Sequence, residues 1–70
     1  MNTTKQKELA AVVQLELSRN EDGCEVKLSD LDDLGMPLKS IVFADWLTLF
    51  GFRMCKPNGG YVCLFNVTGV

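Results

Sequence analysis

Three cysteines, Cys24, Cys55 and Cys63, are the side chains of this sequence with the widest chemistry, because a thiolate can act as nucleophile, disulfide partner or metal ligand. Their number is odd, they form no CxxC motif, and histidine is absent. The sequence therefore predicts neither a disulfide framework nor a zinc site, and we expect reduced, partly buried thiols. Without a histidine or a glycine-rich phosphate loop, we expect no enzyme and no cofactor.

The aspartates of "DLDDL" are a second group with metal-binding chemistry. A calcium loop needs a glycine at its sixth position and a glutamate at its twelfth. Counted from Asp30, these positions hold Gly35 and Ile41, so we expect no metal site. Ser29 and Asp32 instead have capping-box spacing, which predicts a short helix that ends at Gly35. Its apolar residues should face the core: Leu28, Leu31 and Leu34.

Charge is divided unevenly along the chain. Residues 1–34 contain four bases and eight acids, a net charge of -4, whereas residues 35–70 contain three bases and one acid, a net charge of +2. The bases of the second half are Lys39, Arg53 and Lys56, and its acid is Asp45. An anion should therefore bind the second half.

The length of 70 residues predicts a single domain, residues 1–70, that is too small for a large internal active site. Binding should therefore occur on the surface. No apolar run approaches the roughly 20 residues that span a bilayer, and "MNTTKQKELA" lacks the apolar core of a signal peptide. We expect no membrane association and a cytoplasmic location.

The elements that must position these side chains begin with a helix over residues 4–18. Thr3 and Gln6 have capping-box spacing, and apolar residues follow at helical intervals: Leu9, Val12, Val13 and Leu17. "VQLELS" also alternates as a strand does, so a hairpin through "RNEDG" is the alternative for residues 12–28. "CEVKL" alternates after Gly23 and predicts a strand over residues 24–28.

A longer helix is predicted over residues 37–50, because Pro37 suits a first helical turn and Gly51 suits the end. At about 100° per residue its bulky residues occupy one half of the wheel and should fill the core. This half holds Leu38, Val42, Phe43, Trp46, Leu47, Leu49 and Phe50. The other half is small and nearly neutral, and it holds Ser40, Ile41, Ala44, Asp45 and Thr48.

"FRMC" and "YVCLFNV" predict a hairpin over residues 52–66 that turns through "KPNGG". Pairing across this turn places Lys56 opposite Tyr61, and therefore Cys55 opposite Val62. Cys55 and Cys63 would then lie on opposite faces, which argues against a bridge between them. Both faces of this hairpin would be apolar, although only one can pack inward. Phe52, Met54, Cys63 and Phe65 would share one face, and Cys55, Val62 and Leu64 the other.

The order helix, strand, short helix, longer helix, hairpin and the wording "VKLSDLDDLGMPLKSIVFADWLTLFGFRM" resemble the winged helix-turn-helix superfamily. The resemblance covers residues 4–67 and implies a small α+β fold. It also implies that the helix of residues 37–50 enters the DNA major groove, while the wing, residues 52–66, contacts DNA near Lys56 to Gly60. Recognition helices of this superfamily usually carry several Arg, Lys, Gln or Asn residues, whereas this one offers Lys39 alone.

Two functions follow. The first is a small DNA-binding transcriptional regulator, which we expect to be a homodimer because three phosphate contacts per chain are few. The alternative is a winged helix repurposed to bind a host protein, such as an inhibitor or adaptor carried by a phage or other mobile element. The acidic pI of about 4.8 and the nearly neutral recognition face favour this alternative. Both readings use the same candidate residues: Lys39, Ser40, Ile41, Ala44, Asp45, Thr48, Arg53, Lys56, Asn58 and Tyr61.

Overall fold

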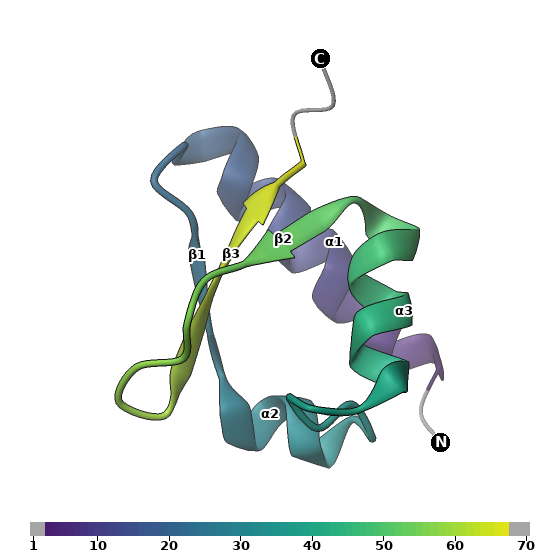
Figure 1. Ribbon diagram of the computed structural model, residues 1–70. Helices are drawn as coiled ribbons and strands as arrows, with labels where there is room; N and C mark the ends of the chain where they lie inside the picture. The colour runs from purple at the N-terminus through teal and green to yellow at the C-terminus, as the bar shows by residue number, and fades with distance from the viewer. Residues whose placement is uncertain (1–2, 68–70) are drawn as a thin grey trace.

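The chain forms three helices and one three-stranded antiparallel sheet in a computed structural model that describes residues 3–67 (Figure 1). In chain order the elements are α1 (Thr3–Arg19), β1 (Cys24–Lys27), α2 (Leu28–Asp33), α3 (Ile41–Phe50), β2 (Phe52–Met54) and β3 (Tyr61–Asn66). This confirms the predicted α+β class and the predicted order of elements. None of the helices in residues 3–67 is long and apolar enough to cross a membrane.

The first helix, α1, confirms the helical prediction, and the alternative hairpin through "RNEDG" is wrong. Ala10, Val13 and Leu17 recur every three or four residues and are all buried, so one helical stripe enters the core. Burial of this stripe outweighs the alternation of "VQLELS". The predicted capping box is wrong, because Thr3 is already helical and the Gln6 side chain donates a 2.8 Å hydrogen bond to Leu34 O.

The short helix α2 begins one residue earlier than its predicted cap. Lys27 is the N-cap residue and makes no side-chain hydrogen bond, whereas Ser29 lies inside the helix. The capping prediction at Ser29 is therefore wrong. β1 runs directly into α2, and the hairpin supplies the partner for the first helical amide, since Leu28 N–H donates to Gly60 O at 2.9 Å.

The longer helix α3 is shorter than predicted, because residues 37–40 form a turn instead of its first helical turn. Ser40 N–H donates to Pro37 O at 2.9 Å. Ser40 is the N-cap, and its hydroxyl accepts a 3.1 Å hydrogen bond from Phe43 N–H. The helix ends at Gly51, as predicted.

The sheet has the strand order β1-β3-β2, and the predicted hairpin register is wrong by one residue. Met54 pairs with Leu64 instead of Cys63. The turn is tighter than predicted, because Asn58 and Tyr61 exchange backbone hydrogen bonds of 2.8 and 3.1 Å. Its two central residues, Gly59 and Gly60, have positive φ angles of 62° and 83°, as a two-residue hairpin turn requires.

The register shift has a local cause in a bulge beside this turn. Cys55 N–H donates to Cys63 O at 3.0 Å, and the next backbone pair is Asn58 with Tyr61. Lys56 and Pro57 therefore lie across from the single residue Val62. Proline has no N–H to donate, which suits this irregular position. Cys55 consequently lies opposite Cys63, contrary to prediction.

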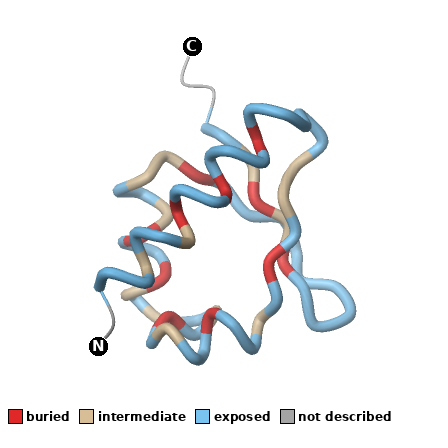
Figure 2. The backbone as a smooth tube through the Cα atoms, turned by 180° about the vertical axis from the view of Figure 1, so that it is seen from behind, coloured by how far each residue is buried: buried red, intermediate tan, exposed pale blue. Residues whose placement is uncertain are grey.

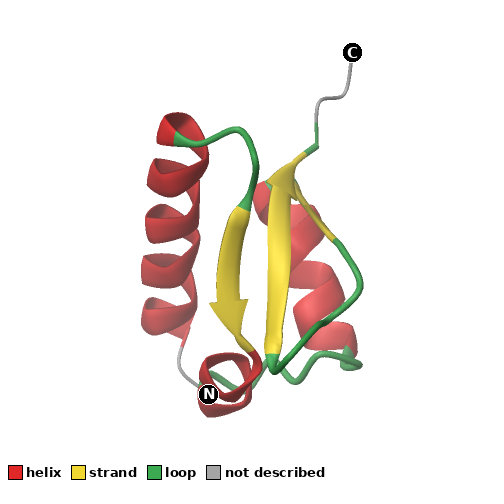
Figure 3. Cartoon of the chain, turned by 90° about the vertical axis from the view of Figure 1, so that its left-hand side faces the viewer, coloured by secondary structure: helices red, strands yellow, loops and turns green. Residues whose placement is uncertain are grey.

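The core lies between the helices and one face of the sheet. α1 packs against β1 and β3, and α3 packs against β2 (Figure 3). Every helix and strand contributes at least one buried residue, as the tube coloured by burial shows (Figure 2). Trp46 confirms its predicted core position at 4% exposure, with ring centroids of Phe43, Phe50 and Phe52 5.3–5.9 Å away. The buried sheet residues are Val26, Phe52, Val62 and Leu64.

Candidate functional site

The outward side of α3 carries the two large apolar side chains with the highest exposed fractions in residues 3–67. Ile41 is 73% exposed and Leu49 is 74% exposed. Ala44, Asp45 and Thr48 are also exposed, as predicted for this face. We call these five residues, Ile41, Ala44, Asp45, Thr48 and Leu49, the α3 surface.

The prediction for Leu49 is wrong, because the helical wheel assigned this exposed residue to the core half. The buried stripe of α3 is narrower than half of the helix: Phe43 and Trp46 are buried, and Leu47 and Phe50 pack partly against the core. Leu49 lies beyond the edge of this stripe. The bulky half of the wheel is therefore divided between the core and the surface.

Two hydroxyls predicted to contact a partner already make hydrogen bonds within the chain. Ser40 is partly buried, and its hydroxyl donates to Pro37 O at 2.7 Å in addition to capping α3. Thr48 Oγ1 donates to Ala44 O, one turn back in the same helix, at 3.1 Å. Both donors are thus used within the chain, so these two candidate residues are less able to donate hydrogen bonds to the base edges of a DNA groove.

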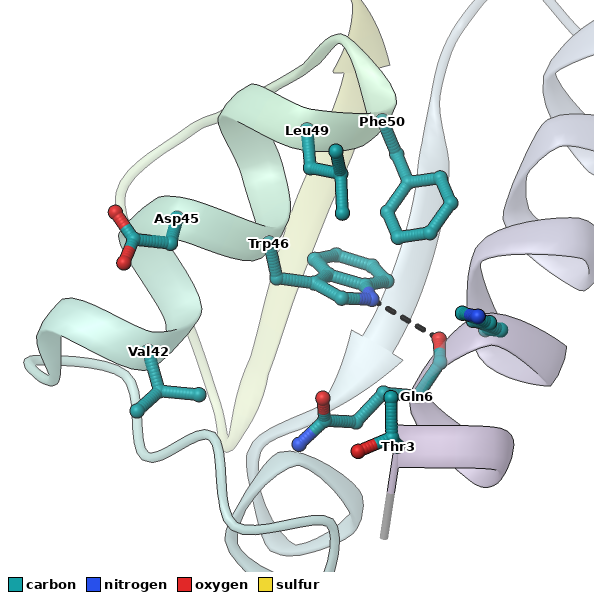
Figure 4. Close-up of a pocket in the computed structure, with 8 residues that line it drawn as sticks. Thr3, Gln6, Val42, Asp45, Trp46, Leu49 and Phe50 are labelled. Carbon is teal, nitrogen blue, oxygen red and sulfur yellow. Dashed lines mark hydrogen bonds between the residues drawn. The ribbon is translucent and has the colours of Figure 1, made fainter. Parts of the chain in front are cut away.

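A groove of about 210 Å³ lies beside the α3 surface, between α3 and the first turns of α1 (Figure 4). Its lining residues are Thr3, Gln6, Lys7, Val42, Asp45, Trp46, Leu49 and Phe50. Trp46 Nε1–H donates a 2.9 Å hydrogen bond to Gln6 O, which joins the two helices. The indole N–H therefore already has its hydrogen-bond acceptor, and the side chain presents its apolar ring to the groove.

Charge at this site is sparse. Asp45 is the only charged residue of the α3 surface, and Figure 4 shows its carboxylate directed away from Trp46, at the outer edge of the groove. Lys7 lines the α1 side of the same groove. An occupant would thus meet an apolar floor with an acid at one edge and a base at the other.

The predicted bases do not lie on the α3 surface. Lys39 lies in the turn before α3, Arg53 lies in β2 opposite Phe65, and Lys56 lies in the bulge of the hairpin. Figure 1 shows the hairpin loop to the left of α2 and α3 to the right. The structure therefore separates the predicted wing contacts from the α3 surface. The residues of these predicted contacts are Lys56, Asn58 and Tyr61.

Sequence reasoning missed the α1 side of the groove. Gln6 and Lys7 follow an ordinary polar helix start, and no local pattern shows that they lie beside α3, about 40 residues further along the chain. No group of three or more potential metal ligands occurs within residues 3–67.

Comparisons of this chain with protein-family models, with curated proteins and with solved structures give no match.

Proposed function

We propose that this chain is a winged-helix-like module that binds another protein, using the α3 surface and the adjoining groove. The observation that supports it most directly is the exposure of Ile41 and Leu49, at 73% and 74%, on one helix face. Apolar residues grouped on a surface are typical of interaction sites, whereas single scattered ones are ordinary. α3 itself contains no lysine or arginine, which a DNA-recognition helix would use to contact phosphates.

The partner segment that fits this site is an amphipathic helix with one large apolar anchor and a neighbouring basic residue. The anchor would enter the groove above Trp46, since the floor is apolar and the indole N–H is already bonded. The basic residue would meet Asp45, the one charge of the α3 surface. Helices commonly bind in apolar grooves in this way, with the charge fixing orientation.

Selection from a displayed library of random peptides tests the proposal. Peptides enriched on the wild-type protein should carry apolar residues at helical spacing next to Lys or Arg. The double variant Ile41→Ser, Leu49→Ser should bind them about 30-fold more weakly or worse, the effect of losing a hot spot.

Leu15→Ser is the matched control, because Leu15 is also an exposed leucine, at 52%, but lies on α1 outside the groove. Its peptide affinity should equal that of the wild type. Peptides that bind the double variant as tightly as the wild type would refute the proposed surface.

Binding of double-stranded DNA is the second candidate function. The supporting observation is the order of elements, with α2, a turn, α3 and the β2–β3 hairpin following one another as in the winged helix-turn-helix proteins that the sequence resembles. Lys39, Arg53 and Lys56 are all exposed and would contact phosphates, with a homodimer supplying a second set.

A titration with double-stranded DNA at low salt separates the two functions. Under the protein-binding proposal the wild type should show no binding. If DNA does bind, and Lys56→Ala lowers the salt slope by about one, the second candidate replaces the first.

A further inference from the structure

Cys55 and Cys63 lie directly opposite each other at the base of the hairpin loop, next to the paired residues Met54 and Leu64. The pairing of Met54 with Leu64 continues to this position, where Cys55 N–H donates to Cys63 O at 3.0 Å. Opposed residues at a hydrogen-bonded position of an antiparallel pair have Cα atoms about 5.5 Å apart. Disulfides span Cα separations of roughly 4.4–6.8 Å, so this position has suitable spacing for a bridge.

The third thiol, Cys24, is not in a position to compete. Cys24 pairs with Leu64, one residue away from Cys63, so the two side chains leave the sheet on opposite faces. β3 lies between β1 and β2, which places Cys24 and Cys55 two strand spacings apart, about 9–10 Å. That separation exceeds the reach of a disulfide.

The two paired thiols differ in their surroundings. Cys55 is exposed. Cys63 is partly buried, and its Sγ lies against the turn after α1, 3.9 Å from Asp22 O. Burial, and secondly the neighbouring Cys55, raise the pKa of the Cys63 thiol, which keeps it protonated at neutral pH. Cys55 is therefore the thiol that a reagent in solution meets first.

We propose that Cys55 and Cys63 form a reversible disulfide that locks the β2–β3 hairpin, made by exchange with a small disulfide such as oxidised glutathione. The Cys55 thiolate attacks one sulfur of oxidised glutathione, forming a mixed disulfide and releasing one glutathione thiolate. Cys63 then loses its proton, and its sulfur attacks the Cys55 sulfur and releases the second glutathione. Two protein protons and two electrons end on the two reduced glutathione molecules.

The bridge would close a ring over residues 55–63, where regular β2 pairing gives way to the bulge and the turn. Closing this ring restricts the unfolded chain, so the oxidised protein should have a thermal midpoint higher by on the order of 10 °C. Because Cys55 is exposed, the bridge remains accessible to reductants, as reversible disulfides are.

Equilibration of the purified chain with mixtures of reduced and oxidised glutathione tests this inference. After acid quenching and alkylation of the remaining thiols, the wild type should carry one alkyl group. Its intact mass should also be lower by two hydrogen atoms, which the bridged pair loses. Chymotrypsin cleaves after Tyr61, between the two cysteines, so the bridged peptides should remain joined until reduced. Cys24→Ser should form the same bridge at the same glutathione ratio.

Cys55→Ser and Cys63→Ser should each lose the bridge and carry only glutathione adducts. Circular dichroism of the reduced variants shows whether each one folds, and the exposed Cys55 makes Cys55→Ser the safer of the two. The inference is overturned if the wild type accumulates glutathione on Cys55 without a bridge. A bridge that disappears in Cys24→Ser would overturn it as well.

Discussion

The inner and outer sides of α3 both carry large apolar side chains, but in opposite environments. Phe43 and Trp46 are 1% and 4% exposed, whereas Ile41 and Leu49 on the same ten-residue helix are 73% and 74% exposed. The difference shows that hydrophobicity alone does not separate core residues from surface residues. Position relative to α1 and the sheet separates them, because only the inner stripe finds neighbours to pack against.

The largest expected effect comes from a substitution on the inner side of α3. Trp46→Ala should lower the free energy of unfolding by about 3–5 kcal/mol, because the indole fills the space among Phe43, Phe50 and Phe52. A loss of this size unfolds many domains of 70 residues at 25 °C. Thermal unfolding followed by circular dichroism measures the change. An unchanged midpoint would show that the inner stripe does not carry the stability assigned to it.

A smaller effect is expected where α3 begins. Ser40→Ala should lower the free energy of unfolding by about 1 kcal/mol, because Phe43 N–H loses its cap. Thr48→Ala is the matched control: it also removes a hydroxyl from α3, but that hydroxyl only bonds back to Ala44 O and should be nearly neutral. Urea unfolding of both variants gives the comparison. Equal losses would mean that Ser40 does not act as the cap.

Much of the fold was predictable because its signals are local. Helical spacing of Val13 and Leu17, the alternation of "CEVKL" and the glycine at position 51 each determine an element from neighbouring residues. The hairpin register was not predictable in this way, since it depends on one extra residue beside Pro57. Four candidate site residues, Ile41, Ala44, Asp45 and Thr48, were correctly predicted to be exposed.

The groove was beyond the reach of sequence patterns for a different physical reason. It lies between α1 and α3, two helices joined by the hydrogen bond from Trp46 Nε1–H to Gln6 O, a contact between residues 40 positions apart. The exposure of Leu49 also depends on tertiary structure, because the wheel shows only that it borders the apolar stripe. How wide the stripe becomes is decided by the space that α1 and the sheet leave for α3.

The outer side should be nearly neutral for stability. Leu49→Ser and Ile41→Ser should each change the free energy of unfolding by about 0.5 kcal/mol or less, because these side chains are already in water. Leu47→Ser is the matched control from the same helix, and its partly buried side chain packs against the core, so its loss should be clearly greater. Urea unfolding measures all three. A loss at Leu49 as large as that at Leu47 would place Leu49 in the core.

The smallest expected effect concerns the thiols of the sheet, which differ in burial as the two sides of α3 do. Burial raises the pKa of the Cys24 thiol, with Glu16, Cys63 and Glu25 adding to the shift, and burial likewise raises the pKa of Cys63. A raised pKa leaves less thiolate at a given pH, so both should react with iodoacetamide more slowly at neutral pH than the exposed Cys55.

Peptide mapping of the reduced protein after brief alkylation measures the three rates. In urea the protection of Cys24 and Cys63 should disappear, because unfolding removes the burial that causes it. Raising the pH of the folded protein should accelerate the alkylation of these two thiols. Their thiolate fraction is small at neutral pH and grows as the pH approaches the raised pKa. Equal rates for all three cysteines in the folded chain would show that the turn after α1 does not cover Cys63.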